Sequence, residues 1–253
     1  MNKDKIMIMV TGTMISPYDE NWKECYRTWI PELKKLGYHI LIAIGKPDLE
    51  TEWKLDGDFI YFRAEDTKMG LWDKSIRLPI KWILEETDYE YYFRIDSDSF
   101  VAPIRFDTMM HHNFQDYGKI DYMGCVHPCD GWNPHRFMRF KVQPKLGYIA
   151  SGCGYMVSKD SMKIALDKMR IVEEPLDYQI DDWVLGRAMW ENGVEMLHDS
   201  RILFESKHKE LVKDPNGIGI PDIADPQSHL ALQHYMNGHM DEAMITLGYK
   251  HKI

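Results

Sequence analysis

The sequence predicts an α/β fold in a single domain, built on a mostly parallel central sheet with helices on both faces. Strand-length apolar runs alternate with helical patterns through the N-terminal half, and this alternation is typical of parallel strands joined by helices. The chain has 253 residues, of which 44% are hydrophobic, so it can bury one large core. No repeat, low-complexity tract or linker divides it.

The predicted elements of the N-terminal half alternate along the chain. The apolar run Ile6–Val10 ends at a glycine-containing turn and predicts a buried strand. Apolar residues at helical spacing predict a helix over Trp22–Leu36, which Pro31 divides into two pieces and Gly37 ends. The other elements of this half are strands at His39–Ile44, Phe59–Phe62 and Tyr91–Ile95, and a helix over Trp72–Glu86 with a kink near Pro79.

The second half of the chain is less regular. Its expected elements are a long polar and aromatic loop over Gly124–Leu146, a strand at Gly154–Val157, helices over Ser161–Met169 and Asp181–Asn192, and a loop over Lys213–Asp225. We expect a main domain over residues 1–208 and, over residues 209–253, a C-terminal loop and helical extension packed on the same domain.

Charge and composition exclude several classes of protein. The 31 basic and 40 acidic residues give a net charge of −9, and a nonspecific nucleic-acid binder needs basic surfaces instead. No apolar run approaches the ~20 residues of a membrane span. The four cysteines lack the density of a disulfide scaffold and the paired spacing of a zinc site. We therefore expect a cytoplasmic protein with reduced thiols and no nucleic-acid partner.

Two polar segments follow strands of the predicted sheet. Thr11-Gly12-Thr13 comes after the first strand, and Asp96-Ser97-Asp98 comes directly after the fourth. Because ligands of such sheets bind beyond the carboxyl ends of the strands, we expect both segments at one rim. Two carboxylates one residue apart on a turn can hold a hard divalent cation, whose other ligands are water and substrate phosphates. The alternative is an ordinary capping turn.

Acids and a histidine of the second half are further candidates. Asp181 and Asp182 begin a predicted helix, where they either cap it and complement its dipole or present a general base. His208 is either a third metal ligand, as a neutral imidazole, or an ordinary surface histidine.

Five segments within residues 6–208 match short motifs in order. They are Arg27-Thr28-Trp29, Asp66 with Leu71 and Lys74, Tyr92–Val101, Tyr148 with Ser151–Ser158, and Asp181–Gly186. Together they resemble the Arg-x-Thr-Trp, Asp…Lys, Asp-x-Asp, Ser-Gly-x-Gly-Tyr and Glu-Asp-Val-x-x-Gly elements of the fringe and beta-1,3-galactosyltransferase group. The resemblance implies a glycosyltransferase with a GT-A catalytic domain over residues 1–208. Ser97 stands where this group usually has a middle acid.

The resemblance also implies roles for the candidate residues. Asp98 would bind Mn²⁺ or Mg²⁺ directly, Asp96 would contact the nucleotide ribose or the waters of the metal, and His208 would complete the metal site. Asp182, with Asp181 beside it, would match the catalytic base that deprotonates the acceptor hydroxyl. The implied reaction is an inverting, metal-dependent transfer from a nucleotide sugar, with a UDP-sugar favoured, to a glycan or other hydroxyl acceptor.

Further residues are expected beside the donor. The nucleotide side would be lined by Thr11, Gly12, Lys74, Asp96 and Ser97. Sugar faces would stack on Trp132, Tyr148 and Tyr155.

Two other functions were weighed against a transferase. A nucleotidyltransferase also holds Mg²⁺ and a nucleotide at the rim of a parallel sheet, but such enzymes usually carry a glycine-rich, basic loop after the first strand. Here Thr11–Asp19 contains one glycine and no Lys or Arg. A non-catalytic glycan-binding module on the same fold predicts loss of the Asp-x-Asp motif or of the helix-start acid, and both are present.

Overall fold

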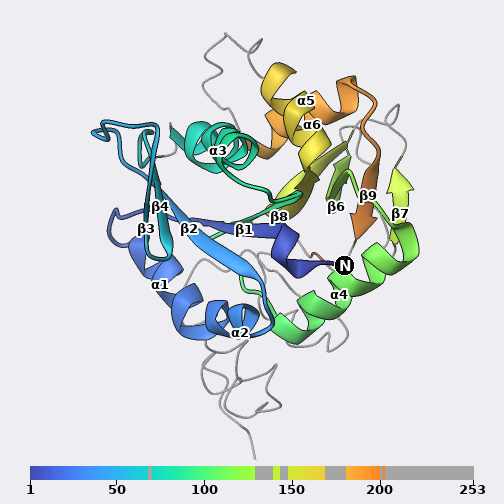
Figure 1. Ribbon diagram of the computed structural model, residues 1–253, viewed down its shortest axis with the longest axis horizontal. Coiled ribbons are helices and arrows are strands. Elements are labelled where there is room, and N and C mark those ends of the chain that lie inside the picture. The colour runs from blue at the N-terminus through green and yellow to red at the C-terminus, as the bar shows by residue number, and fades with distance from the viewer. Residues whose placement is uncertain (68–69, 129–138, 143–147, 169–180, 200–201, 203–253) are drawn as a thin grey trace, which may run out of the picture.

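The computed structural model describes residues 1–67, 70–128, 139–142, 148–168, 181–199 and 202. These residues form a nine-stranded sheet with helices on both faces (Figure 1). The strand order is β3-β4-β2-β1-β5-β8-β6-β9-β7. The predicted α/β architecture is confirmed. None of the described helices has the length and apolar character needed to cross a membrane.

The sheet and its helices have the following bounds. The strands are β1 (Ile6–Thr11), β2 (His39–Gly45), β3 (Trp53–Asp56), β4 (Phe59–Phe62), β5 (Tyr91–Asp96), β6 (Tyr122–Pro128), β7 (Arg139–Val142), β8 (Tyr148–Ser158) and β9 (Met196–Asp199). The α-helices are α1 (Asp19–Thr28), α2 (Ile30–Lys35), α3 (Leu78–Glu86), α4 (Pro103–Tyr117), α5 (Lys159–Lys168) and α6 (Asp181–Glu191). A 3₁₀ turn, η1 (Lys3–Lys5), precedes β1, and a π-helical segment, η3 (Asp73–Arg77), leads into α3.

Parallel pairing occupies one half of the sheet. β4, β2, β1 and β5 run parallel, and all six residues of β1 are buried, as expected for a strand covered on both faces. In the other half β8 pairs antiparallel with both β5 and β6, and β7 pairs antiparallel with β9. The sheet is therefore mixed beyond β5, where the sequence predicted mostly parallel pairing.

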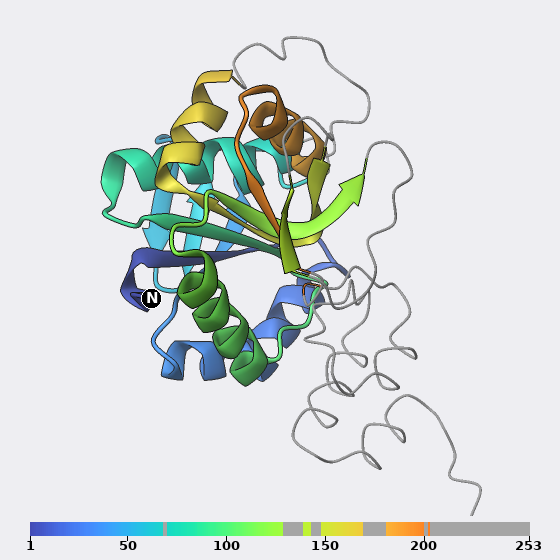
Figure 2. The same ribbon diagram turned by 90° about the vertical axis from the view of Figure 1, so that its right-hand side faces the viewer.

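Two hydrophobic cores lie on opposite faces of the sheet. Ile8 and Val10 of β1 belong to the core beneath α1, α2 and α4, while Met7 and Met9 belong to the core beneath α3, α5 and α6. Figures 1 and 2 show these two sets of helices on either side of the strands. The alternation along β1 follows from the period of two in a strand.

The two predicted helix interruptions are confirmed. Pro31 lies in the first turn of α2, after α1 has ended at Thr28. Pro79 lies in the first turn of α3, after the π-helical segment η3. Proline lacks the N–H that a helix interior requires, whereas the first turn of a helix leaves that group unused.

The prediction of a continuous loop over Gly124–Leu146 is wrong. Tyr122–Pro128 forms β6 and Arg139–Val142 forms β7, because β8 and β9 supply hydrogen-bond partners from distant parts of the chain. β3, α4 and β9 were also missed by the sequence patterns. The loop predicted over Lys213–Asp225 and the C-terminal extension lie outside the described residues.

Two titratable groups are fully buried at the end of β9. His198 and Asp199 have 0% exposure, and Asn113 Nδ2 donates to Asp199 Oδ2 at 2.6 Å. Burial lowers the pKa of His198 from 6.5 to about 4, although the charge of Asp199 opposes the change. The folded protein therefore keeps this imidazole neutral at pH values where the unfolded chain protonates it.

This depressed pKa predicts an acid-induced loss of stability. Between pH 6.5 and 4 the unfolded state binds a proton at His198 that the native state refuses, so the free energy of unfolding falls as the pH is lowered. The loss from this group between pH 7 and pH 5 is expected to be about 2 kcal/mol. Urea unfolding of wild type and His198→Gln at both pH values measures it. The exposed His111 provides the control, since His111→Gln should retain the full pH dependence, and equal pH dependence in all three proteins would contradict the assignment.

Candidate active site

The parallel pairing of β1 with β5 places the two predicted polar segments together. Thr11, the last residue of β1, lies opposite Asp96, the last residue of β5. Ser97 N donates to Thr11 O at 3.1 Å, which continues the pairing into the turn. The prediction that Thr11-Gly12-Thr13 and Asp96-Ser97-Asp98 share the carboxyl rim of the sheet is therefore confirmed.

A short turn carries the acid motif. Ser99 N donates to Asp96 O at 3.0 Å, and Asp98, between them, is half-buried. The fully buried Cys25 of α1 donates its thiol to Ser97 O at 3.0 Å. Burial, together with the negative charge of Asp98, holds the pKa of the Cys25 thiol well above its usual range, so this cysteine remains a protonated donor beneath the turn.

Arg94 was not singled out by the sequence patterns. It lies on β5 two residues before Asp96 and therefore on the same face of the sheet. The guanidinium is 1% exposed and binds Asp96 through two nitrogens, with Nη1 2.9 Å from Oδ2 and Nη2 2.6 Å from Oδ1. Its centre lies 5.7 Å from the ring centroid of Tyr155. An Arg two positions before a rim carboxylate on a buried strand was the available signal.

Tyr155 lies within the core instead of on the rim surface. It is 0% exposed and contacts Tyr122 edge to face, with ring centroids 6.2 Å apart. The expectation that Tyr155 stacks on a sugar is not supported by this position, because packing from neighbouring strands covers its ring. Its position beside Arg94 supports the guanidinium instead.

Lys74 forms a buried ion pair that anchors the loop after β1. Its Nζ lies 2.9 Å from Asp66 Oδ1 and donates to Gly12 O at 3.0 Å. Asp66 in turn accepts hydrogen bonds from Thr13 Oγ1 at 2.8 Å and Met14 N at 2.7 Å. Lys74, expected to line the nucleotide side, thus reaches the rim through the backbone it holds.

Thr11 and Gly12 occupy tightly packed positions at the end of β1. Thr11 is 5% exposed, and its hydroxyl has no hydrogen-bond partner. Gly12 N donates to Ala43 O at 3.0 Å, and a Cβ on Gly12 would lie 3.1 Å from side-chain carbons of Trp22 and Ile44. Glycine is therefore required by close packing, and the chain can pass directly beneath any ligand at the rim.

The helix-start acids are found at the start of α6, as predicted. Asp181 is the first residue of α6, and Asp182, the second, is buried at 9% exposure. α6 packs against β8, which is the strand that pairs with β5 and places Tyr155 opposite Arg94. β8 therefore links the helix that bears Asp182 to the strand that bears Asp96.

The chemistry of the described acids suits a hard cation. Carboxylate oxygens are preferred ligands of Mg²⁺ and Mn²⁺, and the half-buried Asp98 supplies them at the rim. Within the described part of the chain, no group of three His, Cys, Asp or Glu side chains is arranged to hold a metal. His208 and Trp132 lie outside that part, as does the side chain of Tyr148. A cation at Asp98 would thus draw further ligands from water or substrate phosphates.

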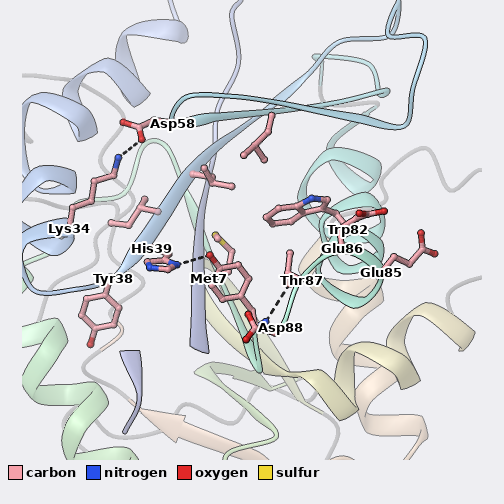
Figure 3. Close-up of a pocket in the computed structure, with 14 residues that line it drawn as sticks. Met7, Lys34, Tyr38, His39, Asp58, Trp82, Glu85, Glu86, Thr87 and Asp88 are labelled. Carbon is pink, nitrogen blue, oxygen red and sulfur yellow. Dashed lines mark hydrogen bonds and ion pairs between the residues drawn. The ribbon is translucent and has the colours of Figure 1, made fainter. Parts of the chain in front are cut away.

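A pocket of about 810 Å³ lies away from this rim. Figure 3 shows its lining, which includes Met7 near the start of β1, His39 at the start of β2 and the Lys34–Asp58 ion pair. His39 Nδ1 lies 2.6 Å from the hydroxyl of Tyr89. The pocket is therefore at the amino ends of the parallel strands, opposite the candidate site.

The Lys74–Asp66 pair predicts a large difference between buried and surface ion pairs. Lys74→Met leaves Asp66 as a buried charge without its cation, which is expected to lower the free energy of unfolding by about 3–5 kcal/mol. Lys81→Met is the matched control, because it removes the partly exposed ion pair with Glu52 and should cost less than about 1 kcal/mol. Urea denaturation compares the two, and equal losses would show that Lys74 contributes no special stability.

Comparison with known proteins follows from this geometry. A family model described as galactosyltransferase matches residues 27–200, whereas no curated protein sequence matches. A glycosyltransferase involved in the glycosylation of the major capsid of PBCV-1 is similar over 74% of each chain, with 15% identity and a TM-score of 0.44. The 4-diphosphocytidyl-2C-methyl-D-erythritol synthase from Anaerococcus prevotii DSM 20548 is similar over 93% of this chain and 100% of that chain, with 12% identity and a TM-score of 0.45.

The family match includes the principal candidate residues of the rim. Residues 27–200 contain Lys74, Asp96, Asp98 and Asp182, and the mixed α/β sheet with helices on both faces agrees with the expected GT-A fold. This protein therefore belongs to the galactosyltransferase family and is a glycosyltransferase.

Proposed function

We propose that this glycosyltransferase moves a sugar from a nucleotide sugar, in particular a UDP-sugar, to a hydroxyl group of a glycan, with Mn²⁺ or Mg²⁺ and with inversion at the anomeric carbon. The observation that carries the proposal is the rim at which Thr11 pairs with Asp96 and the turn to Asp98 begins. Membership of the family supplies the reaction class. The rim supplies the oxygen ligands and the close backbone that a nucleotide diphosphate requires.

Local charge favours an anionic donor at this rim despite the acidic chain. The net charge of −9 opposes binding of a diphosphate. Arg94 offsets Asp96 and Lys74 offsets Asp66 at short distances, so two of the nearby carboxylates are already neutralised. A divalent cation held by Asp98 would neutralise charge on the departing diphosphate when it is bound.

Asp182 is the proposed general base. Its position in the first turn of α6 resembles that of a carboxylate presented to the acceptor. Asp182 would accept the proton of the acceptor hydroxyl while that oxygen bonds to the anomeric carbon. The bond from this carbon to the diphosphate oxygen breaks with its electron pair, which leaves as the nucleoside diphosphate. Attack from the face opposite the leaving group inverts the anomeric centre.

The proposal also includes a cytoplasmic location and no nucleic-acid partner. Cys25 and Cys125 are free thiols, which are favoured in a reducing compartment. The excess of acidic residues opposes binding to a phosphate backbone.

Substitutions at the rim and at α6 are expected to separate binding from catalysis. Asp98→Asn should weaken Mn²⁺-dependent binding of the donor by at least about ten-fold, because a metal ligand is lost. Asp182→Asn should bind the donor normally but lower kcat by about a hundred-fold or more, because the proton acceptor is lost. Calorimetry with a panel of nucleotide sugars, with and without Mn²⁺, and a transfer assay measure the two effects. Asp56→Asn, an exposed substitution on β3, is the charge-matched control.

Each result has a definite consequence. Metal-dependent binding of one UDP-sugar, lost in Asp98→Asn alone, supports the proposal and identifies the donor. Full turnover by Asp182→Asn removes its role as the base. His208→Ala is expected to weaken Mn²⁺ binding, and unchanged affinity would exclude His208 as a ligand. A folded wild-type protein that binds no nucleotide sugar would favour a glycan-binding module.

A further inference from the structure

Arg94 is a buried cation in the middle of the candidate site. A guanidinium with 1% exposure is costly to bury unless its charge is paired and its donors are used. Both conditions are met by Asp96, whose two carboxylate oxygens each receive one guanidinium nitrogen, at 2.9 and 2.6 Å. Tyr155 packs against the guanidinium from β8. The pair has the forked geometry in which an arginine fixes the plane of a carboxylate.

This contact changes what Asp96 can bind. A carboxylate has about four lone-pair sites, and the guanidinium occupies one on each oxygen. The remaining sites can accept hydrogen bonds from neutral donors such as hydroxyl groups. A divalent cation on the same oxygens would be held close to the positive charge of Arg94, which repels it.

Asp98 differs from Asp96 in its surroundings. It lies beyond the end of β5, on the turn, and is half-buried. Its charge acts on Cys25 of α1, which belongs to the core on the other face of the sheet from Tyr155. The two acids of the motif are thus separated in chemistry, one fixed by a cation on one face of the sheet and the other on the turn.

We propose that Arg94 is a positioning residue that holds Asp96 as a hydrogen-bond acceptor for a hydroxyl of the bound donor and keeps it from coordinating the metal directly. Asp98 is then the direct metal ligand of the pair. This inference rests on the proposed function, because it assigns unequal roles to two acids of the same site. A purely structural ion pair would affect stability but would leave the two acids equivalent toward the metal.

Binding of Mn²⁺ alone tests this division of roles. Free Mn²⁺ is measured by electron paramagnetic resonance during titration of nucleotide-free wild type, Asp96→Asn, Asp98→Asn and the control Asp56→Asn. The expected Mn²⁺ affinity of Asp96→Asn is within about two-fold of wild type, while that of Asp98→Asn falls by at least about ten-fold. Asp96→Asn should nevertheless raise the KM for the donor, because its carboxylate acceptor is lost.

Substitution of Arg94 provides an independent readout. Arg94→Met releases Asp96 from its partner, so Mn²⁺ should bind the nucleotide-free protein more tightly than it binds wild type, by about three-fold or more. The gain should disappear in the double variant Arg94→Met/Asp96→Asn, and Arg94→Lys should resemble wild type more closely than Arg94→Met does. A structural role alone produces no gain in metal affinity. If Arg94→Met does not fold, the comparison of Asp96→Asn with Asp98→Asn decides the question.

The outcomes distinguish this inference from the function on which it rests. Equal loss of Mn²⁺ affinity in Asp96→Asn and Asp98→Asn, in a protein whose wild type binds Mn²⁺, overturns the role of Arg94 and leaves the proposed transferase intact. Absence of Mn²⁺ binding by wild type overturns the metal requirement of the proposed function, and this inference with it.

Discussion

The parallel pairing of β1 with β5 is the constraint on which the candidate site depends. Both strands are covered by helices on two faces, so a slip of one residue would exchange every side chain between the two cores. The register that satisfies both cores is the one that places Thr11 opposite Asp96. Hydrophobic burial thereby determines the position of the polar residues at the rim.

Two buried ion pairs extend this order from the strands into the loops. Asp66 and Lys74 connect the segment after β1 with the start of η3 through hydrogen bonds to Gly12 and Thr13. Arg94 and Asp96 perform the same task at the end of β5. In both pairs a cation neutralises a carboxylate near the rim, so the site is ordered without an accumulation of uncompensated negative charge.

The helix beneath the acid turn explains why a distant motif belongs to the same site. Cys25 of α1 donates to the carbonyl of Ser97, and Trp29, which follows α1, is fully buried in the same core. Arg27, by contrast, is largely exposed and pairs with Glu24. The Arg27-Thr28-Trp29 segment therefore acts mainly by packing, which agrees with a supporting role for the turn.

The alternation of strands and helices up to β5, the proline interruptions and the rim position of the Asp96-Ser97-Asp98 turn were all determined by local sequence. Each depends on features that act within a few residues, namely apolar periodicity, the missing N–H of proline and the polarity of parallel strands. The family motifs were likewise readable without the structure.

The tertiary structure alone decided the mixed half of the sheet and the partners of the buried charges. β6, β7 and β9 are stabilised by pairing with strands distant in sequence, so their local pattern carries little signal. Arg94 and Asp96 are two residues apart, yet their roles depend on β8, which covers Arg94 with Tyr155. The sequence by itself determined which residues stand at the rim. The packing of distant strands decided which charges are neutralised there, because burial and pairing are properties of the assembled core.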